Sequence, residues 1–240
     1  MGSSSRILLI VATIVGGLAA DVHTDIVGQT MIGLIVWLTL FSLLPDVDRD
    51  ARFMLMACLV IATVGEIVLS LGWGLYTYRL DNIPLFVPPG HVLLLLLGLR
   101  LARRMSENAA LAIIGGAGAC SIALAAAQVD TLGVWLFGVL LTASLAVPEH
   151  RRLYASTFLL ALGLELLGTW FGNWGWAHEV SGTPLVTTNP PLAAGAFYCA
   201  LDALVVVASA WLAPRLPGAV GQERSTKVQT FFSRGVLPSK

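Results

Sequence analysis

Three acidic residues stand inside long apolar runs, where an ionisable side chain normally faces the protein interior: Glu66, Glu165 and Asp202. A carboxyl group in apolar surroundings can keep its proton near neutral pH and act as a general acid, while a second carboxylate acts as a base. Hydrogen bonding between helices is the structural alternative for each of them. We predict that all three are catalytic.

Two stretches of similar composition follow the two glutamates. Each contains a glycine, then two aromatic residues with one residue between them, then a single proline before leucine, and finally a diproline. Aromatic faces stabilise cations, but tryptophan and tyrosine also gather at membrane interfaces, so both roles stay open. Together with polar residues beside the two diprolines, these stretches supply the predicted substrate-binding set: Trp73, Tyr76, Tyr78, His91, Trp170, Trp174, Trp176 and Asn189.

We predict neither a metal nor a cofactor. His23, Asp25 and His91 are chemically suitable metal ligands, but no close spacing of histidine, cysteine and glutamate marks a site. The sequence also lacks a Walker motif, a GxSxG elbow, an HExxH motif and a paired-aspartate diphosphate motif. These absences argue against nucleotide-driven transport, elbow-type hydrolysis, zinc proteolysis and diphosphate-dependent prenyl transfer.

The composition indicates which elements must hold these residues. Of the 240 residues, 57% are hydrophobic and 12% are charged, whereas about a quarter of an ordinary soluble domain is charged. The net charge is zero, so no attraction to nucleic acid is expected. A spanning helix needs about 20 apolar residues. We predict an all-α, polytopic integral membrane bundle of about eight transmembrane helices, at 7–20, 27–45, 53–73, 89–103, 109–127, 131–147, 153–171 and 192–213.

The basic residues predict the orientation of these spans. Of the 14 lysines and arginines, only Arg79 lies on the opposite side of an eight-span arrangement from the rest. Because lysine and arginine are retained on the cytoplasmic side, both termini are predicted to be cytoplasmic, in the cell membrane. Residues 1–214 then form one transmembrane domain and 215–240 a cytoplasmic tail. The first span also has the shape of a signal peptide, whose cleavage would leave seven spans.

The two halves of the chain resemble each other. The glycines before the aromatic pairs, Gly74 and Gly172, are 98 residues apart, while Glu66 and Glu165 are 99 apart, so small insertions are needed to align the halves. We predict two parallel four-helix repeats, at about 7–103 and 109–213, related by an axis along the membrane normal.

The deep polar residues gather in the outward half of the predicted spans. Glu66 and Glu165 lie about two helical turns below the outer ends of their spans, and Asp202 lies about three turns below. The loops above them are rich in proline, glycine and aromatic residues, which is typical of a folded cap. We therefore expect a pocket that opens toward the outer side.

The first half contains the motif "E…G-x-G-x-Y-x-Y…I-P-L-F-V-P", carried by Glu66, Gly72, Gly74, Tyr76, Tyr78, Pro84 and Pro88. This motif resembles one found in membrane carotenoid hydratases of the bisanhydrobacterioruberin type. The resemblance covers about 25 of the 240 residues, and the second half departs from it, with tryptophans in place of the tyrosines and "TTNPP" in place of the proline segment. It implies that Glu66 donates a proton to an isoprenoid double bond and that aromatic residues surround a cationic intermediate.

These patterns favour an intramembrane enzyme that acts on a lipid or isoprenoid by protonation, hydration or cyclisation, such as an isoprenoid hydratase or cyclase. Its expected partner is a membrane lipid or isoprenoid. Two alternatives stay open: a non-catalytic membrane subunit that binds a partner or pigment, and a small-solute transporter. A transporter requires a polar path across the whole membrane, and the inner halves of the predicted spans contain few polar residues.

Overall fold

The computed structural model describes residues 3–47 and 49–212, so the tail predicted at 215–240 lies outside the described residues. Within the described part, eight α-helices are joined by short helical turns and two strands. In chain order the elements are α1 (Ser3–Asp21), α2 (Ile26–Leu43), the 3-10 helix η1 (Leu44–Asp46), α3 (Arg49–Glu66), the π-helix η2 (Ile67–Gly72), β1 (Tyr76–Tyr78), α4 (Val87–Ala102), α5 (Glu107–Ala126), α6 (Leu132–Ala146), the 3-10 helix η3 (Pro148–His150), α7 (Arg151–Phe171), β2 (Trp174–Trp176) and α8 (Gly195–Leu212).

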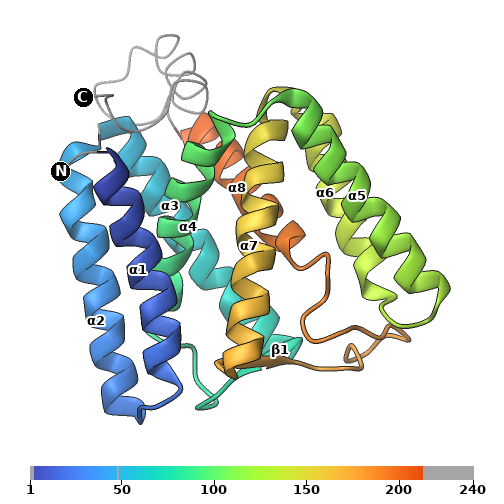
Figure 1. Cartoon of the computed structure of the whole chain (residues 1–240), viewed down its shortest axis with the longest axis horizontal. Coiled ribbons are helices and arrows are strands. Elements are labelled where there is room, and N and C mark those ends of the chain that lie inside the picture. Colours follow the sequence, from blue (N-terminus) through green and yellow to red (C-terminus); the bar gives the residue numbers. More distant parts are fainter. Residues whose placement is uncertain (1–2, 48, 213–240) are drawn as a thin grey trace.

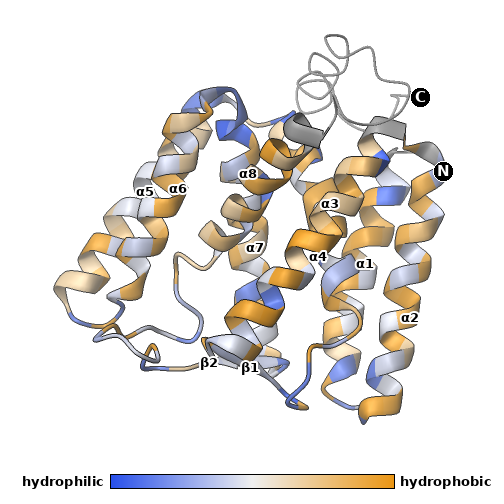
Figure 2. Cartoon of the chain, turned by 180° about the vertical axis from the view of Figure 1, so that it is seen from behind, coloured by the Kyte–Doolittle hydropathy of each residue, from blue (hydrophilic) through white to orange (hydrophobic). Residues whose placement is uncertain are grey.

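The apolar character of these helices fits an all-α membrane bundle. Five helical segments are long and apolar enough to cross a membrane, and the remaining three helices are apolar but shorter. Large apolar side chains such as Leu8, Leu38 and Trp135 are exposed on the helix surfaces, which suits contact with lipid better than contact with water. Figure 2 shows hydrophobic residues along the helices and hydrophilic residues gathered in the connections at both ends of the bundle.

The helices form a central group flanked by two hairpins (Figure 1). In the centre, α3 packs on α4 and α8, while α7 packs on α8 and α4. The α1–α2 hairpin lies on one side of this group and the α5–α6 hairpin on the other. Both strands lie at the end of the bundle opposite to the start of α1, and we call this end the sheet end.

Local sequence explains where the helices that border the sheet end begin and stop. Asp25 caps α2, because its carboxylate accepts hydrogen bonds from the backbone N–H groups of Val27 and Gly28. The diproline lies in the first turn of α4, which begins slightly earlier than its predicted span. Gly172 ends α7 with a φ of 87°, a left-handed conformation that turns the chain directly into β2.

The two strands pair antiparallel, and the pairing is symmetric about its central residues. Thr77 lies opposite Gly175 at the centre, and these residues are 98 residues apart, the offset that separates the two glycine–aromatic motifs. On one side of this central pair Tyr76 lies opposite Trp176, and on the other side Tyr78 lies opposite Trp174. The first aromatic residue of each motif therefore faces the second aromatic residue of the other motif. The two outer loops, which were predicted as separate segments, are therefore joined in one two-stranded sheet.

Candidate functional site

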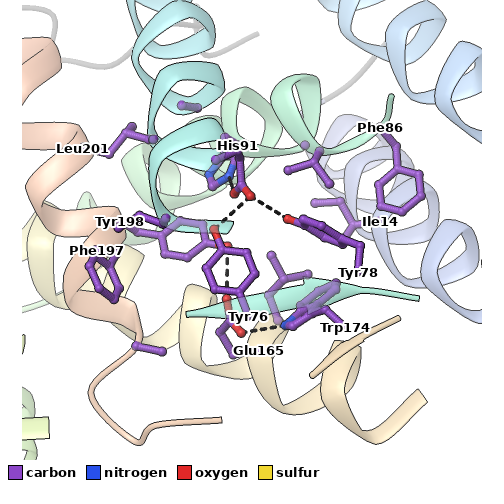
Figure 3. Close-up of a pocket in the computed structure, with 18 of the residues that line it drawn as sticks. Ile14, Tyr76, Tyr78, Phe86, His91, Glu165, Trp174, Phe197, Tyr198 and Leu201 are labelled. Atoms are coloured by element: carbon purple, nitrogen blue, oxygen red, sulfur yellow. Dashed lines mark hydrogen bonds and ion pairs between the residues drawn. The ribbon is translucent and has the colours of Figure 1, made fainter. Parts of the chain in front are cut away.

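A cavity of about 360 Å³ lies inside the bundle at its sheet end. Its walls come from α1, α2, α3, η2, α4, α7 and α8, and side chains of both strands close it at the sheet end. Most of the lining is apolar, with Ile14 on one side and Leu201 on the other (Figure 3). The polar groups gather in one part of the wall, around two carboxyl groups.

Glu66, the last residue of α3, is buried and has three side-chain partners. Its Oε2 accepts hydrogen bonds from the hydroxyl groups of Tyr76 at 2.8 Å and Tyr78 at 2.7 Å. Its Oε1 lies 2.9 Å from Nε2 of His91, in the first turns of α4. The two tyrosines can reach one carboxylate because alternate residues of a strand point to the same face. Figure 3 shows both phenols pointing toward His91.

Glu165, on α7, has an equivalent set of partners from the second half of the chain. Its Oε2 accepts hydrogen bonds from Nε1 of Trp174 at 2.8 Å and from Nε1 of Trp176 at 2.9 Å. The hydroxyl of Tyr198, on α8, lies 3.5 Å from its Oε1. The ring of Trp174 packs directly over Gly168, leaving no room there for a Cβ atom. This glycine therefore lets the indole reach the carboxyl group.

Each of the two carboxyl groups binds the aromatic pair that follows it, although the spacings differ by one residue. Glu66 precedes Tyr76 by ten residues, whereas Glu165 precedes Trp174 by nine. The extra residue falls where the chain forms the π-helix η2, while α7 stays α-helical to Phe171. A π-helix has i→i+5 hydrogen bonds and so holds more residues per turn than an α-helix. The π-helix thereby accommodates the longer spacing between Glu66 and Tyr76.

Aromatic rings connect the two halves of the site. The rings of His91 and Tyr198 lie 4.8 Å apart between centroids, with an interplanar angle of 32°. Tyr76 and Trp176, which face each other across the strand pair, have centroids 4.8 Å apart. The partners of one carboxyl group therefore touch the partners of the other, and the site is continuous.

The tyrosines of β1 act as fixed donors. Burial, followed by the nearby Glu66 carboxylate, raises the pKa of Tyr76 and of Tyr78 above the usual range, so both keep their protons near neutral pH. Oε2 of Glu66 accepts both phenol hydrogen bonds, whereas its Oε1 contacts His91. Nδ1 of His91 is buried and has no hydrogen-bond partner among the described residues.

A second polar cluster lies beside the cavity at the sheet end. Asp21, at the end of α1, is fully buried and accepts hydrogen bonds from Gln29 Nε2 at 2.9 Å and Asn173 Nδ2 at 2.9 Å. Arg79 donates to the backbone oxygen of Thr24 at 2.8 Å and lies 3.5 Å from the Asp21 carboxylate. This cluster connects the α1–α2 hairpin to the segments that carry the strands, and so positions the cavity wall.

Seven of the residues singled out in the sequence line this cavity. They include two of the three predicted catalytic acids and most of the predicted substrate-binding set. The seven are Glu66, Tyr76, Tyr78, His91, Glu165, Trp174 and Trp176.

The other four predicted residues lie elsewhere. Asp202 is buried on α8 outside the cavity lining, and its Oδ2 has no hydrogen-bond partner in the described part of the chain. The indole of Trp73 donates to the backbone oxygen of Ser181 at 3.0 Å and so joins the two loops. Trp170 is 79% exposed on α7. Asn189 accepts a hydrogen bond from the backbone of Trp176 at 3.0 Å, which positions β2 rather than the cavity.

Three aromatic residues of the lining were not among those predicted: Phe86, Phe197 and Tyr198. Tyr198 had a usable signal, because it is the only tyrosine in the predicted eighth span. Phe86 lies within the proline motif of the first half, whereas Phe197 had no signal, since a phenylalanine in an apolar run is as readily explained by packing or by lipid contact.

Neither a metal centre nor a relative explains this site. Across residues 3–47 and 49–212, no three histidine, cysteine, aspartate or glutamate side chains are grouped so as to hold a metal ion. Comparisons of the chain with protein-family models, curated proteins and solved structures found no match. The chemistry is therefore argued from the cavity itself.

Proposed function

We propose that this chain is an intramembrane enzyme that acts on a lipid or isoprenoid by acid–base chemistry in the cavity. One observation carries the proposal. The Glu66–His91 pair, 2.9 Å apart, and a second carboxyl group, Glu165, line one apolar cavity. Paired titratable groups in an apolar, partly enclosed site are typical of acid–base catalysis.

The Glu66–His91 pair is the proposed proton donor. Its shared proton would form a new C–H bond with the electron pair of a substrate double bond, leaving a carbocation on the neighbouring carbon. Water can then add to this cation and return a proton to the pair, which is hydration. Alternatively, attack by a second double bond of the substrate and loss of a proton to the pair complete a cyclisation. Either route restores the enzyme, so no redox partner is needed.

Glu165 has a different role in this proposal. Its closest donors are the indole N–H groups of Trp174 and Trp176, which do not release their protons near neutral pH. Such a carboxyl group is suited to stabilising positive charge on the substrate rather than to exchanging a proton. The aromatic rings around it support the same role, because their faces attract cations.

The substrate is proposed to enter from the bilayer. Val64 on α3, Val68 on η2 and Leu204 on α8 line the cavity and are also more than half exposed at the helix surface. An apolar wall that continues to the lipid-facing surface favours a long apolar molecule over a water-soluble one. The resemblance of the first motif to carotenoid hydratases makes a polyene isoprenoid the first substrate to test.

We also propose that all eight helices span the cell membrane, with both termini cytoplasmic and the sheet end outside. Successive helices run in alternating directions (Figure 1), and the basic side chains of Arg103, Arg104 and Arg152 are exposed near the end opposite to the sheet. The symmetric antiparallel pairing of the two strands and the extra residue at η2 support an internal repeat of four helices.

Deuterium incorporation tests the enzymatic proposal. Purified protein would be incubated with isoprenoid lipid extracts in deuterated buffer, and the lipids analysed by mass spectrometry. Protonation of a double bond places deuterium on carbon, and we expect this with the wild type but not with Glu66→Gln. Glu179→Gln, which changes an exposed carboxyl group outside the cavity, is the matched control. Equal incorporation by wild type and Glu66→Gln would refute the proposal, and an unchanged bound lipid in both would favour a pigment-binding subunit.

A further inference from the structure

We infer that the cavity binds lipid-soluble cations, namely a single ammonium group carried on an apolar chain. The inference deepens the proposed function, on which it rests for the location of the site. It concerns the binding of a stable positive charge, however, and this can be measured without any turnover. It follows from the charges of the lining, from its aromatic rings and from the apolar route to the surface.

The described lining has more acidic than basic groups. Glu66 and Glu165 both line the cavity. Among the described residues that line it, His91 is the single basic one. His91 is already paired with Glu66. The hydrogen-bond donors around Glu165 are two indoles and a phenol, all of them neutral. The charged form of a buried carboxyl group is stabilised most by a cation, and a ligand can supply the one that the wall beside Glu165 lacks.

Arg79 does not supply that charge. It is the nearest arginine to the strands in sequence, yet it does not line the cavity. Its guanidinium donates to the backbone oxygens of Asp21 and Thr24 and lies beside the Asp21 carboxylate. Its charge is therefore committed to the neighbouring polar cluster.

Aromatic side chains surround the carboxyl group of Glu165. Trp174, Trp176 and Tyr198 contact Glu165, and Phe197 stacks on Trp176 with ring centroids 6.2 Å apart. Aromatic rings grouped around a carboxylate are the usual means of recognising quaternary ammonium groups, because ring faces attract a cation without the strong hydration that a polar wall would need to replace.

The rest of the wall determines what carries the charge. Val36, Leu201 and Leu204 provide aliphatic surface, and Leu204 is also exposed toward the lipid. A volume of about 360 Å³ is at the small end of ligand pockets, so it accommodates a head group and the first part of a chain. A phosphate or carboxylate head group would meet the carboxyl group of Glu165, whose hydrogen-bond donors are all neutral, so anionic lipids are disfavoured.

Matched probes test this inference. Octyltrimethylammonium carries a permanent charge, and 2,2-dimethyldecane is its neutral carbon isostere. Their affinities for wild type and Glu165→Gln would be measured in the same detergent micelles by tryptophan fluorescence. The ratio of the two probe affinities is then compared between the two proteins, so that partitioning of each probe into micelles cancels. We expect the preference for the ammonium over the isostere to fall about tenfold in Glu165→Gln. Glu179→Gln should leave the preference unchanged.

A second measurement needs no variant and covers the case in which Glu165→Gln fails to fold. Octyltrimethylammonium should raise the thermal unfolding midpoint of the wild type, and the isostere should not, because only a ligand of the folded state stabilises it. Equal effects of both probes on the wild type, or an unchanged preference in a folded Glu165→Gln protein, would overturn the inference. Such a result would not affect the deuterium experiment with Glu66→Gln, which tests the enzymatic proposal. The two proposals can therefore be refuted independently.

Discussion

Oε1 of Glu66 and Nε2 of His91 lie 2.9 Å apart on the cavity wall, although the two residues come from different helices. The other carboxylate oxygen of Glu66 accepts two phenol hydrogen bonds, so this contact is where a proton can move. The same arrangement explains why a histidine first considered for substrate binding is better placed as half of an acid–base pair.

His91→Gln should therefore lower deuterium incorporation by about 10²–10⁴-fold, the range in which acid–base groups contribute to rate. Glutamine can still hydrogen-bond to Glu66, so the fold should be retained, but an amide cannot carry the proton. His178→Gln is the control, since His178 lies in an exposed loop outside the cavity. Full activity of His91→Gln would show that the histidine only positions Glu66.

Gly168→Ala should disturb the second carboxyl site. A methyl group at this position would overlap the ring of Trp174 and push its indole away from Glu165. We expect destabilisation of about 1–3 kcal/mol, the usual result of overpacking. Gly163→Ala, on the same helix, is the control, because its added methyl group meets no atom within 4 Å. Thermal unfolding followed by circular dichroism would compare them, and equal midpoints would contradict the close packing.

Asp21→Ala should weaken the connection between the α1–α2 hairpin and the strands. It leaves Gln29, Asn173 and Arg79 without their shared acceptor, and loss of one partner from a buried charged cluster is destabilising by about 3–5 kcal/mol. Asp25→Ala removes only the exposed cap of α2, which we expect to be worth about 1 kcal/mol. Limited proteolysis and unfolding midpoints would test this order, and the reverse order would refute it.

Deleting Ile67 should be tolerated better than deleting Leu166. The two residues directly follow Glu66 and Glu165, and their exposed fractions are 48% and 47%. Removing Ile67 would let η2 become α-helical and give Glu66 the spacing that Glu165 already has, whereas removing Leu166 would break the register of α7. The yield of monodisperse protein after detergent extraction is the readout. Equal loss in both would count against the internal repeat.

The proposed orientation can be tested by cysteine labelling. Ser181 lies exposed in the loop at the sheet end, and Asn108 lies exposed at the start of α5, near the opposite end of the bundle. A membrane-impermeant maleimide added to intact cells should label Ser181→Cys but not Asn108→Cys. Disrupting the membrane should then expose Asn108→Cys as well. Labelling of Asn108→Cys alone in intact cells would reverse the assignment.

The sequence by itself determined the class of the fold and the elements of the site. Long apolar runs require a helical bundle in lipid, because backbone groups there must be satisfied within each helix. The spacing of glycine, aromatic and proline residues identified two segments of similar pattern, and a glutamate precedes each. These are properties of local order along the chain, so no knowledge of packing was needed to find them.

Only the tertiary structure decided which of these residues meet. Asp202 and Glu165 are both buried acids in apolar helices, yet only Glu165 lines the cavity. The sequence could not separate them, because a helix that is apolar on every side carries no signal for its rotation about its own axis. That rotation is set by contacts with other helices, by close approaches such as Trp174 over Gly168, and by the residue that η2 accommodates. The pairing of Glu66 with His91 and of the two strands with each other depends on the same packing.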